Sequence, residues 1–229
     1  MKLGIMQPYF LPYIGYFQLI KAVDKYVIYD DVNFIKKGWI NRNNFLFNGQ
    51  SFMFTLTLLK ASQNKLINEI FVLEDQSKLL KTIRIAYQKA PQFLSVFPVV
   101  ENIFGYEDKN LARYVGNSLI QIADYLQLNT EFIYSSDIEK DHSLKAQDKI
   151  LNLCEMMRTT EYINAIGGME LYSKELFEGN NIKLSFLKTQ SAEYKQFGNS
   201  FVPNLSILDV LMFNSVEETN KLLEQYNLI

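Results

Sequence analysis

The sequence of 229 residues contains one cysteine and one histidine, and it has no long apolar run. Because Cys154 stands alone, an intramolecular disulfide is excluded, which fits a reducing compartment. No stretch approaches the roughly 18 apolar residues of a membrane span, and the apolar run at the amino terminus is too short for a signal-peptide core. We therefore expect a cytoplasmic protein that does not insert into a membrane.

A strong charge of either sign is also missing. The net charge of −2 and the pI of about 5.6 give no electrostatic reason to expect nucleic acid or an anionic membrane as the main partner. No P-loop, complete GxGxxG motif or His/Cys spacing typical of a metal site occurs, so no metal site is expected and the sequence leaves any cofactor unknown. The hydrophobic content is 48%, and the sequence has no repeat, low-complexity tract or flexible linker. These features predict a single α/β domain over residues 1–229.

The amino-terminal segment has the pattern of a βαβ unit. Residues 3–6 form a short apolar run that stops at Gln7-Pro8, as expected of a buried strand that ends in a turn. After Pro12, the spacing of Ile14, Phe17 and Ile20 predicts a helix, and residues 26–29 predict a second strand. Since such crossovers are almost always right-handed, we expect two parallel strands.

Further along, Asn48-Gly49 separates two apolar segments and predicts a hairpin with a type I′ turn. Helices are predicted over residues 77–89, 109–127 and 145–158, and strands over 131–134, 162–166 and 182–187. Ser215 and Glu218 form a capping box that opens the last helix. The expected fold is Rossmann-like α/β, with a mostly parallel sheet, an antiparallel hairpin inserted on it and a helical carboxyl half.

The loop after the first strand is the first candidate site, because ligands of open α/β sheets bind outside the carboxyl ends of strands. Its candidate substrate-binding residues are Gln7, Pro12, Gly15 and Tyr16. The alternative is a rigid corner in which Tyr13 and Tyr16 only pack. The layout resembles that of HIGH-motif nucleotidyltransferases (the HUP fold), although tyrosines stand where that motif has histidines. The resemblance implies a related fold, while chemistry that needs a cationic histidine is not expected here.

The end of the second strand carries Asp30-Asp31, followed by Arg42 and Asn43. Asp31 is a candidate catalytic base and Arg42 a candidate ligand for phosphate or carboxylate, with Asn43 beside it. Consecutive strand residues point to opposite faces, so both aspartates need not reach one site. Solvated loop charges and a surface ion pair are the alternatives. The sole histidine, His142, is a second candidate base, although a helix-entry loop explains its position equally.

The carboxyl half supplies the remaining candidate substrate-binding residues. Glycines that follow a strand permit a ligand to approach the backbone, although they also serve as helix-entry turns. A serine followed three residues later by an aspartate can form a helix N-cap, and the aspartate can alternatively accept hydrogen bonds from sugar hydroxyls. These residues are Gly167, Gly168, Tyr172, Tyr194, Gln196, Ser206 and Asp209.

Taken together, four groups of residues resemble the WbqC-like protein family: Gln7-Pro8 with Pro12 and Gly15, Asp24 with Asp30-Asp31, Asn41-Arg42-Asn43, and the stretches 162–172, 194–196 and 201–209. The resemblance runs from Gln7 to about Asn214. The family takes its name from bacterial O-antigen gene clusters. The resemblance therefore implies a role in surface-polysaccharide or nucleotide-amino-sugar biosynthesis, as a transferase that moves an acyl or aminoacyl group onto a sugar amine.

The partner expected from this resemblance is a small-molecule substrate, either a sugar nucleotide or an activated acyl group. Two alternatives remain open. An adenylylating enzyme on a nucleotide-binding fold would bind ATP, and a non-catalytic small-molecule or carrier-binding protein would retain its ligand without turnover.

Overall fold

The computed structural model describes residues 1–190, 192–198 and 200–229, and a six-stranded sheet lies at its centre. The strand order is β10-β9-β8-β1-β2-β7. Five strands run parallel and β10 pairs antiparallel with β9 at one edge, so the expected mostly parallel sheet is confirmed. The strands are β1 (Lys2–Met6), β2 (Lys25–Ile28), β7 (Glu131–Tyr134), β8 (Glu161–Ala165), β9 (Lys183–Thr189) and β10 (Tyr226–Leu228).

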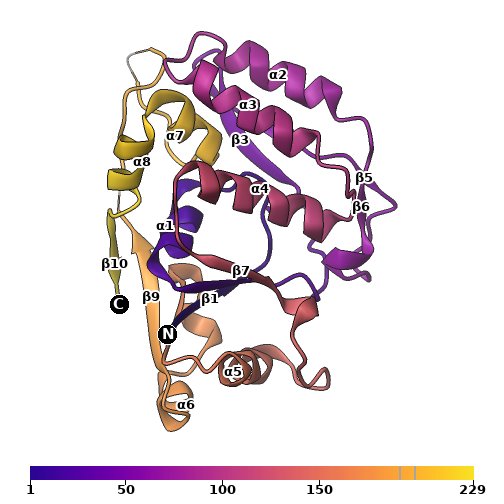
Figure 1. The fold of residues 1–229 in the computed structure, drawn as a ribbon, viewed down its shortest axis with the longest axis vertical. Helices are drawn as coiled ribbons and strands as arrows, with labels where there is room; N and C mark the ends of the chain where they lie inside the picture. Colours follow the sequence, from indigo (N-terminus) through magenta and orange to yellow (C-terminus); the bar gives the residue numbers. More distant parts are fainter. Residues whose placement is uncertain (191, 199) are drawn as a thin grey trace.

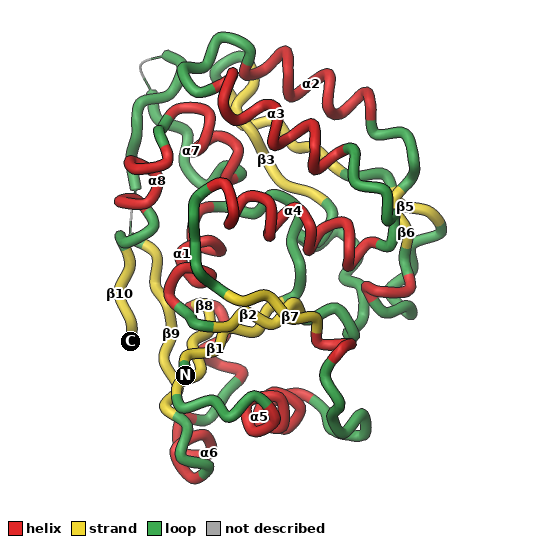
Figure 2. Tube along the Cα trace, in the orientation of Figure 1, coloured by secondary structure: helices red, strands yellow, loops and turns green. Residues whose placement is uncertain are grey.

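Helices cover both faces of this sheet, which Figures 1 and 2 show edge-on. One face carries α5 (Ala146–Met156) and α6 (Lys174–Gly179); the other carries α1 (Ile14–Ala22) and α4 (Leu111–Tyr125). The alternation along β2 explains this, since Val27 packs in the α5 core while Tyr26 and Ile28 pack in the α1 and α4 core. Beyond α4 lie α2 (Ser77–Tyr87), α3 (Phe93–Phe104) and α7 (Ile207–Phe213).

The predicted βαβ unit is present. β1 and β2 are parallel neighbours with Leu3 opposite Lys25, and α1 connects them. From β1 the strand order runs through β2 and β7 in one direction and through β8 and β9 in the other. This reversal is the position at which open α/β sheets form a crevice. The loop after β1 therefore lies where a ligand site is expected.

The predicted hairpin forms, but it does not join the central sheet. β3 (Arg42–Phe47) and β4 (Gln50–Thr55) make a separate two-stranded sheet, and a second small one joins β5 (Leu58–Leu59) to β6 (Phe71–Val72). Asn48 and Gly49 have φ angles of 51° and 75°, as the type I′ turn requires. Phe45 and Phe54 of the hairpin pack on Tyr87 of α2 and on Phe10. Its apolar face is buried by helices and loops, so it needs no place in the central sheet.

The carboxyl half contains the helices α5, α6 and α7, and four of the six central strands, β7 to β10, lie there as well. The sequence analysis gave no strand at β6 or β10 and no helix at α3. In α3 the buried face of Val96, Val100 and Ile103 outweighs the cost of Pro98 within the helix. Among the described residues, no helix has both the length and the apolar character required to cross a bilayer.

The capping box opens α8 (Val216–Leu222) as predicted: the Ser215 hydroxyl accepts from Glu218 N at 3.2 Å, and the Glu218 carboxylate accepts from Ser215 N at 2.8 Å. Ser215→Ala should lower the free energy of unfolding by about 1 kcal/mol in urea denaturation, since it leaves a helix N–H without its partner. Ser95→Ala, on the exposed side of α3, is the matched control and should change stability by less than about 0.5 kcal/mol. Equal effects of the two substitutions would contradict this interpretation.

Candidate functional site

Two adjoining cavities lie against the loop that follows β1. The larger, of about 280 Å³, lies between this loop and β3 and is lined by Tyr9, Pro12, Tyr13, Trp39, Asn43, Asn44 and Asn204. The smaller, of about 80 Å³, lies between the same loop, the end of β9 and residues 192–194 and 201–205. Tyr13 and Asn204 line both. We call them the large cavity and the small cavity; both lie at carboxyl ends of the central strands.

The loop after β1 is fixed by buried anchors. Phe10 N donates to Ile40 O at 2.9 Å, and the Leu11 carbonyl accepts from the Asn43 amide at 2.8 Å and from the Ser206 hydroxyl at 2.7 Å. Leu11 has a φ of 47°, in the left-handed region. Because these anchors come from two distant segments, residues 40–43 and Ser206, the wall of the large cavity is held in place before a ligand arrives.

Gly15 allows α1 to pack closely against the end of β9. A Cβ at this position would lie 2.4 Å from the Thr189 hydroxyl and 2.4 Å from the Tyr13 ring. Both of those residues line the small cavity. Gly15 thus shapes the cavity wall, and the close approach that it permits is to side chains of this chain.

The large cavity combines aromatic rings with amide groups. Trp39 is 47% exposed and Tyr13 37% exposed, so both rings present open surface. Within the described part of the chain, the side-chain amides of Asn44 and Asn204 form no hydrogen bond. The Asn43 side chain, in contrast, donates to Leu11 O and accepts from Asn44 N. Burial raises the pKa of the Tyr13 hydroxyl, an effect that Thr189 partly offsets. Tyr13 is therefore a neutral donor near pH 7, and the amides are available to a ligand.

Arg42 lies beside this cavity. Its Nε donates to Gly38 O at 2.9 Å, and the guanidinium lies 5.8 Å from the centre of the Trp39 ring. Arg42 and Asn44 occupy the same face of β3, because side chains two residues apart on a strand share a face. The structure therefore places Pro12 and Asn43 in the lining of the large cavity and Arg42 beside its Trp39 wall, and their role in substrate binding stays a prediction.

Three further predicted residues support the cavities from behind. The buried Tyr16 donates to Gln7 O at 2.7 Å, which ties α1 to the end of β1. Burial raises the pKa of the Tyr16 hydroxyl well above its usual value. Ser206 is buried and caps α7 by accepting from Leu208 N at 3.2 Å, in agreement with the N-cap alternative. Gln7, Tyr16 and Ser206 line neither cavity.

Asp209 lies at the centre of a buried polar cluster. Its carboxylate accepts from the Tyr87 and Tyr194 hydroxyls at 2.7 Å each and from the Gln196 amide at 2.6 Å. Gln196 also accepts from Val202 N at 2.8 Å, so the cluster pins the segment that walls the small cavity. Burial raises the pKa of Asp209, and the three donors partly offset this. Of these residues, Tyr194 lines the small cavity, while Asp209 is fully buried beneath it.

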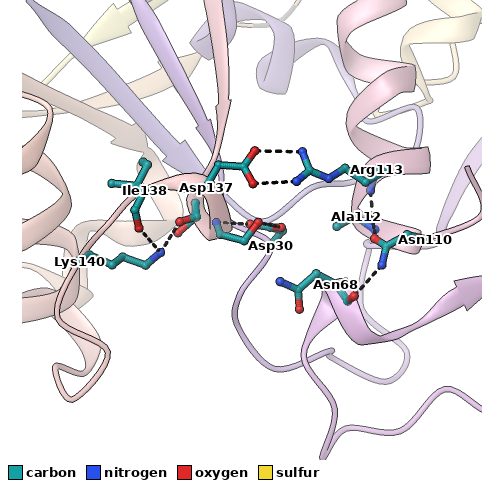
Figure 3. A network of polar contacts seen from close by, with 10 residues as sticks. Asp30, Asn68, Asn110, Ala112, Arg113, Asp137, Ile138 and Lys140 are labelled. Carbon is teal, nitrogen blue, oxygen red and sulfur yellow. Dashed lines mark hydrogen bonds and ion pairs between the residues drawn. The ribbon is translucent and has the colours of Figure 1, made fainter.

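The two consecutive aspartates after β2 point to opposite faces of the sheet. Asp30 is buried and accepts from Ser136 N at 2.9 Å and from its hydroxyl at 2.7 Å. Figure 3 shows Asp30 in a network with Asp137, which binds Arg113 of α4 through two hydrogen bonds, and with Asn110, which caps α4. This network joins the ends of β2 and β7 to α4.

Asp31 instead faces the α5 side. Its Oδ2 lies 3.0 Å from Lys140 Nζ and 3.2 Å from Lys149 Nζ. Burial acts to raise the pKa of Asp31, but the Ser135 hydroxyl and the two lysines outweigh it and lower the pKa. Asp31 is therefore ionised at neutral pH, and its carboxylate is paired with Lys140 and Lys149.

The other predicted residues lie apart from the cavities. Gly167 and Gly168 belong to the short helix η3 (Ile166–Leu171) after β8, and a Cβ on Gly168 would lie 2.7 Å from the Asn164 amide. Tyr172 packs edge-on against Tyr162 and Phe177 on the α5 and α6 side. His142 is exposed in the loop before α5.

The predicted site residues therefore do not form one site. Some lie at or behind the two cavities, and others lie elsewhere in the molecule. Asp31, His142, Gly167, Gly168 and Tyr172 line neither cavity. Within the described ranges, no three His, Cys, Asp or Glu side chains gather closely enough to hold a metal ion. The thiol of Cys154 is buried in the core, where burial raises its pKa to about 12.

The sequence reasoning missed four lining residues of the large cavity, Tyr9, Trp39, Asn44 and Asn204, and it gave Tyr13 only a packing role. One signal was present: Trp39 is the only tryptophan, in a polar Lys-Lys-Gly-Trp stretch where an apolar core position is not expected. Asn204 has a φ of 59° after Pro203, which is typical of a turn and not of a site.

Comparisons with known proteins agree with the resemblance in the sequence. The model of the WbqC-like protein family matches residues 7–221. A protein of Mycobacterium tuberculosis (strain ATCC 25618 / H37Rv), described as "Uncharacterized protein Rv1507c", is 28% identical over 218 residues, which cover 93% of each chain. No solved structure matches. Since the family model spans nearly the whole sequence, including the loop after β1 and both cavities, this chain belongs to the WbqC-like protein family.

Proposed function

We propose that this chain is a transferase-type enzyme that binds a sugar in the large cavity, in bacterial surface-polysaccharide or nucleotide-amino-sugar biosynthesis. The observation that carries the proposal is the lining of this cavity, where the rings of Tyr9, Tyr13 and Trp39 lie beside asparagine amides. A sugar ring has an apolar face of C–H bonds and a rim of hydroxyls. Aromatic rings bury such a face, and amides both donate to and accept from hydroxyls.

The size of the cavity supports a small ligand. Pockets for drug-sized molecules span about 300–1,000 Å³. At about 280 Å³ the large cavity lies just below this range, which favours one sugar ring over an oligosaccharide. The buried hydrogen bonds of Phe10 and Leu11 hold the neighbouring wall residues in place, which also favours binding with little reorganisation.

The arrangement of two cavities favours transfer over simple binding. A transfer reaction needs two reactants held in contact. The large and small cavities adjoin at Tyr13 and Asn204, so an acceptor in one would lie next to a donor group in the other. The family's association with O-antigen gene clusters supports a sugar amine as the acceptor. The catalytic roles of Asp31 and His142 stay predictions.

Saturation-transfer NMR with a panel of neutral hexoses, amino sugars and N-acetylated amino sugars tests the proposal. At least one sugar should bind, and Asn44→Ala should weaken its binding about tenfold, because one or two hydrogen bonds to the ligand are worth about 1.4 kcal/mol. Asn129→Ala, an exposed asparagine near the amino-terminal ends of the strands, should leave binding within about twofold. The proposal fails if no sugar binds, or if both variants bind it equally.

A further inference from the structure

Positive charge is concentrated in one segment of the chain. Between Asp31 and Glu69 the sequence has no acidic residue, although the net charge of the whole chain is −2. The same segment contains five basic residues: Lys36, Lys37, Arg42, Lys60 and Lys65. Within the described residues none of these five forms an ion pair, whereas Arg84, Arg113, Lys140 and Lys149 all do. The local charge is thus not neutralised by the chain itself.

Three of these residues lie around one loop. Arg42 donates from Nε to the carbonyl of Gly38, the residue next to Lys37. Lys36 and Lys37 are exposed on the same loop, and Lys37 has a φ of 59° that turns the chain there. We call Lys36, Lys37 and Arg42 the basic rim. It lies at the carboxyl side of the central sheet, between the end of β2 and β3.

The basic rim borders the large cavity through Trp39. The Arg42 guanidinium lies 5.8 Å from the centre of the Trp39 ring, and Trp39 lines the cavity. Only Nε of Arg42 has a partner in the described chain, so the two terminal nitrogens remain for a ligand. These nitrogens form the flat fork that binds phosphate through two parallel hydrogen bonds. The contact with Trp39 holds this fork beside the opening.

We propose that the basic rim binds a phosphate group of a ligand whose sugar occupies the large cavity. The substrate class is then a sugar phosphate or a nucleotide-linked sugar, and a neutral free sugar binds more weakly. This inference rests on the proposed function. The number of charges suits one phosphate or pyrophosphate group, whereas long nucleic acids are bound by extended basic surfaces, and the net charge of −2 opposes them.

Intrinsic fluorescence provides a direct readout, because Trp39 is the only tryptophan and lines the cavity. The full-length protein is titrated with N-acetylglucosamine, N-acetylglucosamine 1-phosphate, UDP-N-acetylglucosamine and inorganic pyrophosphate at constant ionic strength. The phosphorylated probes should change the Trp39 emission at concentrations at least tenfold lower than the neutral sugar. Arg42→Gln should weaken the binding of the phosphorylated probes about tenfold, a larger loss than the same substitution causes for the neutral sugar. Arg158→Gln, which removes the same charge from an exposed turn after α5, should bind them like the wild type.

Quenching of Trp39 by iodide and by caesium ions tests the charge without any ligand. The quenching by each ion is expressed relative to its quenching of free N-acetyltryptophanamide. On this scale iodide should quench more strongly than caesium, and the difference should shrink in Arg42→Gln. The inference is overturned if the two ions quench equally, if no phosphorylated probe changes the emission, or if Arg42→Gln and Arg158→Gln behave alike. It is also overturned, in favour of a membrane surface, if only vesicles of phosphatidylglycerol change the emission. If a neutral sugar still binds in any of these cases, the phosphate inference fails and the proposed function stands.

Discussion

Asp31→Asn is expected to lower the free energy of unfolding by about 3 kcal/mol, because it leaves two lysines without their shared carboxylate. The Lys140 side chain is 0% exposed and that of Lys149 is 13% exposed. Lys140 also donates to the carbonyls of Ser135 and Ile138, but these neutral acceptors cannot balance its charge. A buried ammonium group without a counter-charge is among the most costly arrangements in a protein interior.

The pH dependence of stability should change in the same variant. The folded-state pKa of Asp31 is lowered from its usual value of 3.8, so its stabilising contribution is present above pH 3.8 and is lost as the pH falls through the folded-state pKa. Wild type should therefore lose this contribution below about pH 4, and Asp31→Asn should not. The stability difference between the two proteins is expected to be largest at neutral pH and to narrow in acid.

Asp137→Asn is the matched control. Asp137 also pairs with a basic side chain, Arg113, but it is 53% exposed, so water screens the pair and the substitution should cost less than about 1 kcal/mol. Guanidinium denaturation at pH 7 and at pH 3 measures both variants. If Asp31→Asn costs no more than Asp137→Asn at pH 7, the lysine pair is not held by this carboxylate. Activity that is lost from a protein still folded at pH 7 would instead support the predicted role of Asp31 as a base.

Local sequence signals predicted the framework of the site but only part of its lining, Pro12, Asn43 and Tyr194. Prolines and glycines mark backbone positions through their own geometry, which is why the turn at Asn48-Gly49 and the loop around Pro12 could be identified from a few neighbouring residues. The missed helix α3 shows the limit of such signals, since it forms with Pro98 inside it because its buried face outweighs the cost of the proline.

The rest of the cavity lining could not be predicted because it depends on pairing between distant segments. Tyr13 and Ser206 form an isolated bridge, and Ile207 N donates to Pro12 O at 2.7 Å, so residues almost 200 positions apart share one wall. This contact brings Asn204 beside Trp39 and Asn44. No periodicity in the sequence predicts that these three residues lie together, because their proximity arises only when α7 packs against the loop after β1.

Asp209 shows the same limit at a single residue. Its place three residues after Ser206 predicted either the first turn of a helix or a group facing the ligand, and the sequence could not choose between them. The structure places Asp209 in the first turn of α7, but this position does not explain why its side chain is buried. That follows from Tyr87 on α2 and Tyr194 near the small cavity, which reach the carboxylate from two sides.

Asp209→Ala is expected to lower the free energy of unfolding by about 3 kcal/mol, because it leaves the hydroxyls of Tyr87 and Tyr194 and the amide of Gln196 without their acceptor. Tyr194→Phe removes only one of these hydrogen bonds and should cost about 1 kcal/mol. The pH dependence has the opposite sign to that of Asp31. Since the folded-state pKa of Asp209 is raised, its contribution is fully present below pH 3.8 and declines as the pH rises through the folded-state pKa.

The loss should also be visible locally, because Asp209 reaches Val202 through Gln196 and so holds the wall of the small cavity. In Asp209→Ala, limited proteolysis should cut within residues 192–205 at protease concentrations that leave wild type and Tyr194→Phe intact, since local opening follows the loss of local contacts. A uniform loss of stability without preferred cleavage there would show that Asp209 only stabilises the core. Cleavage confined to that segment would show that one buried carboxylate sets the shape of the small cavity, and through Tyr13 and Asn204 it would then also set that of the large one.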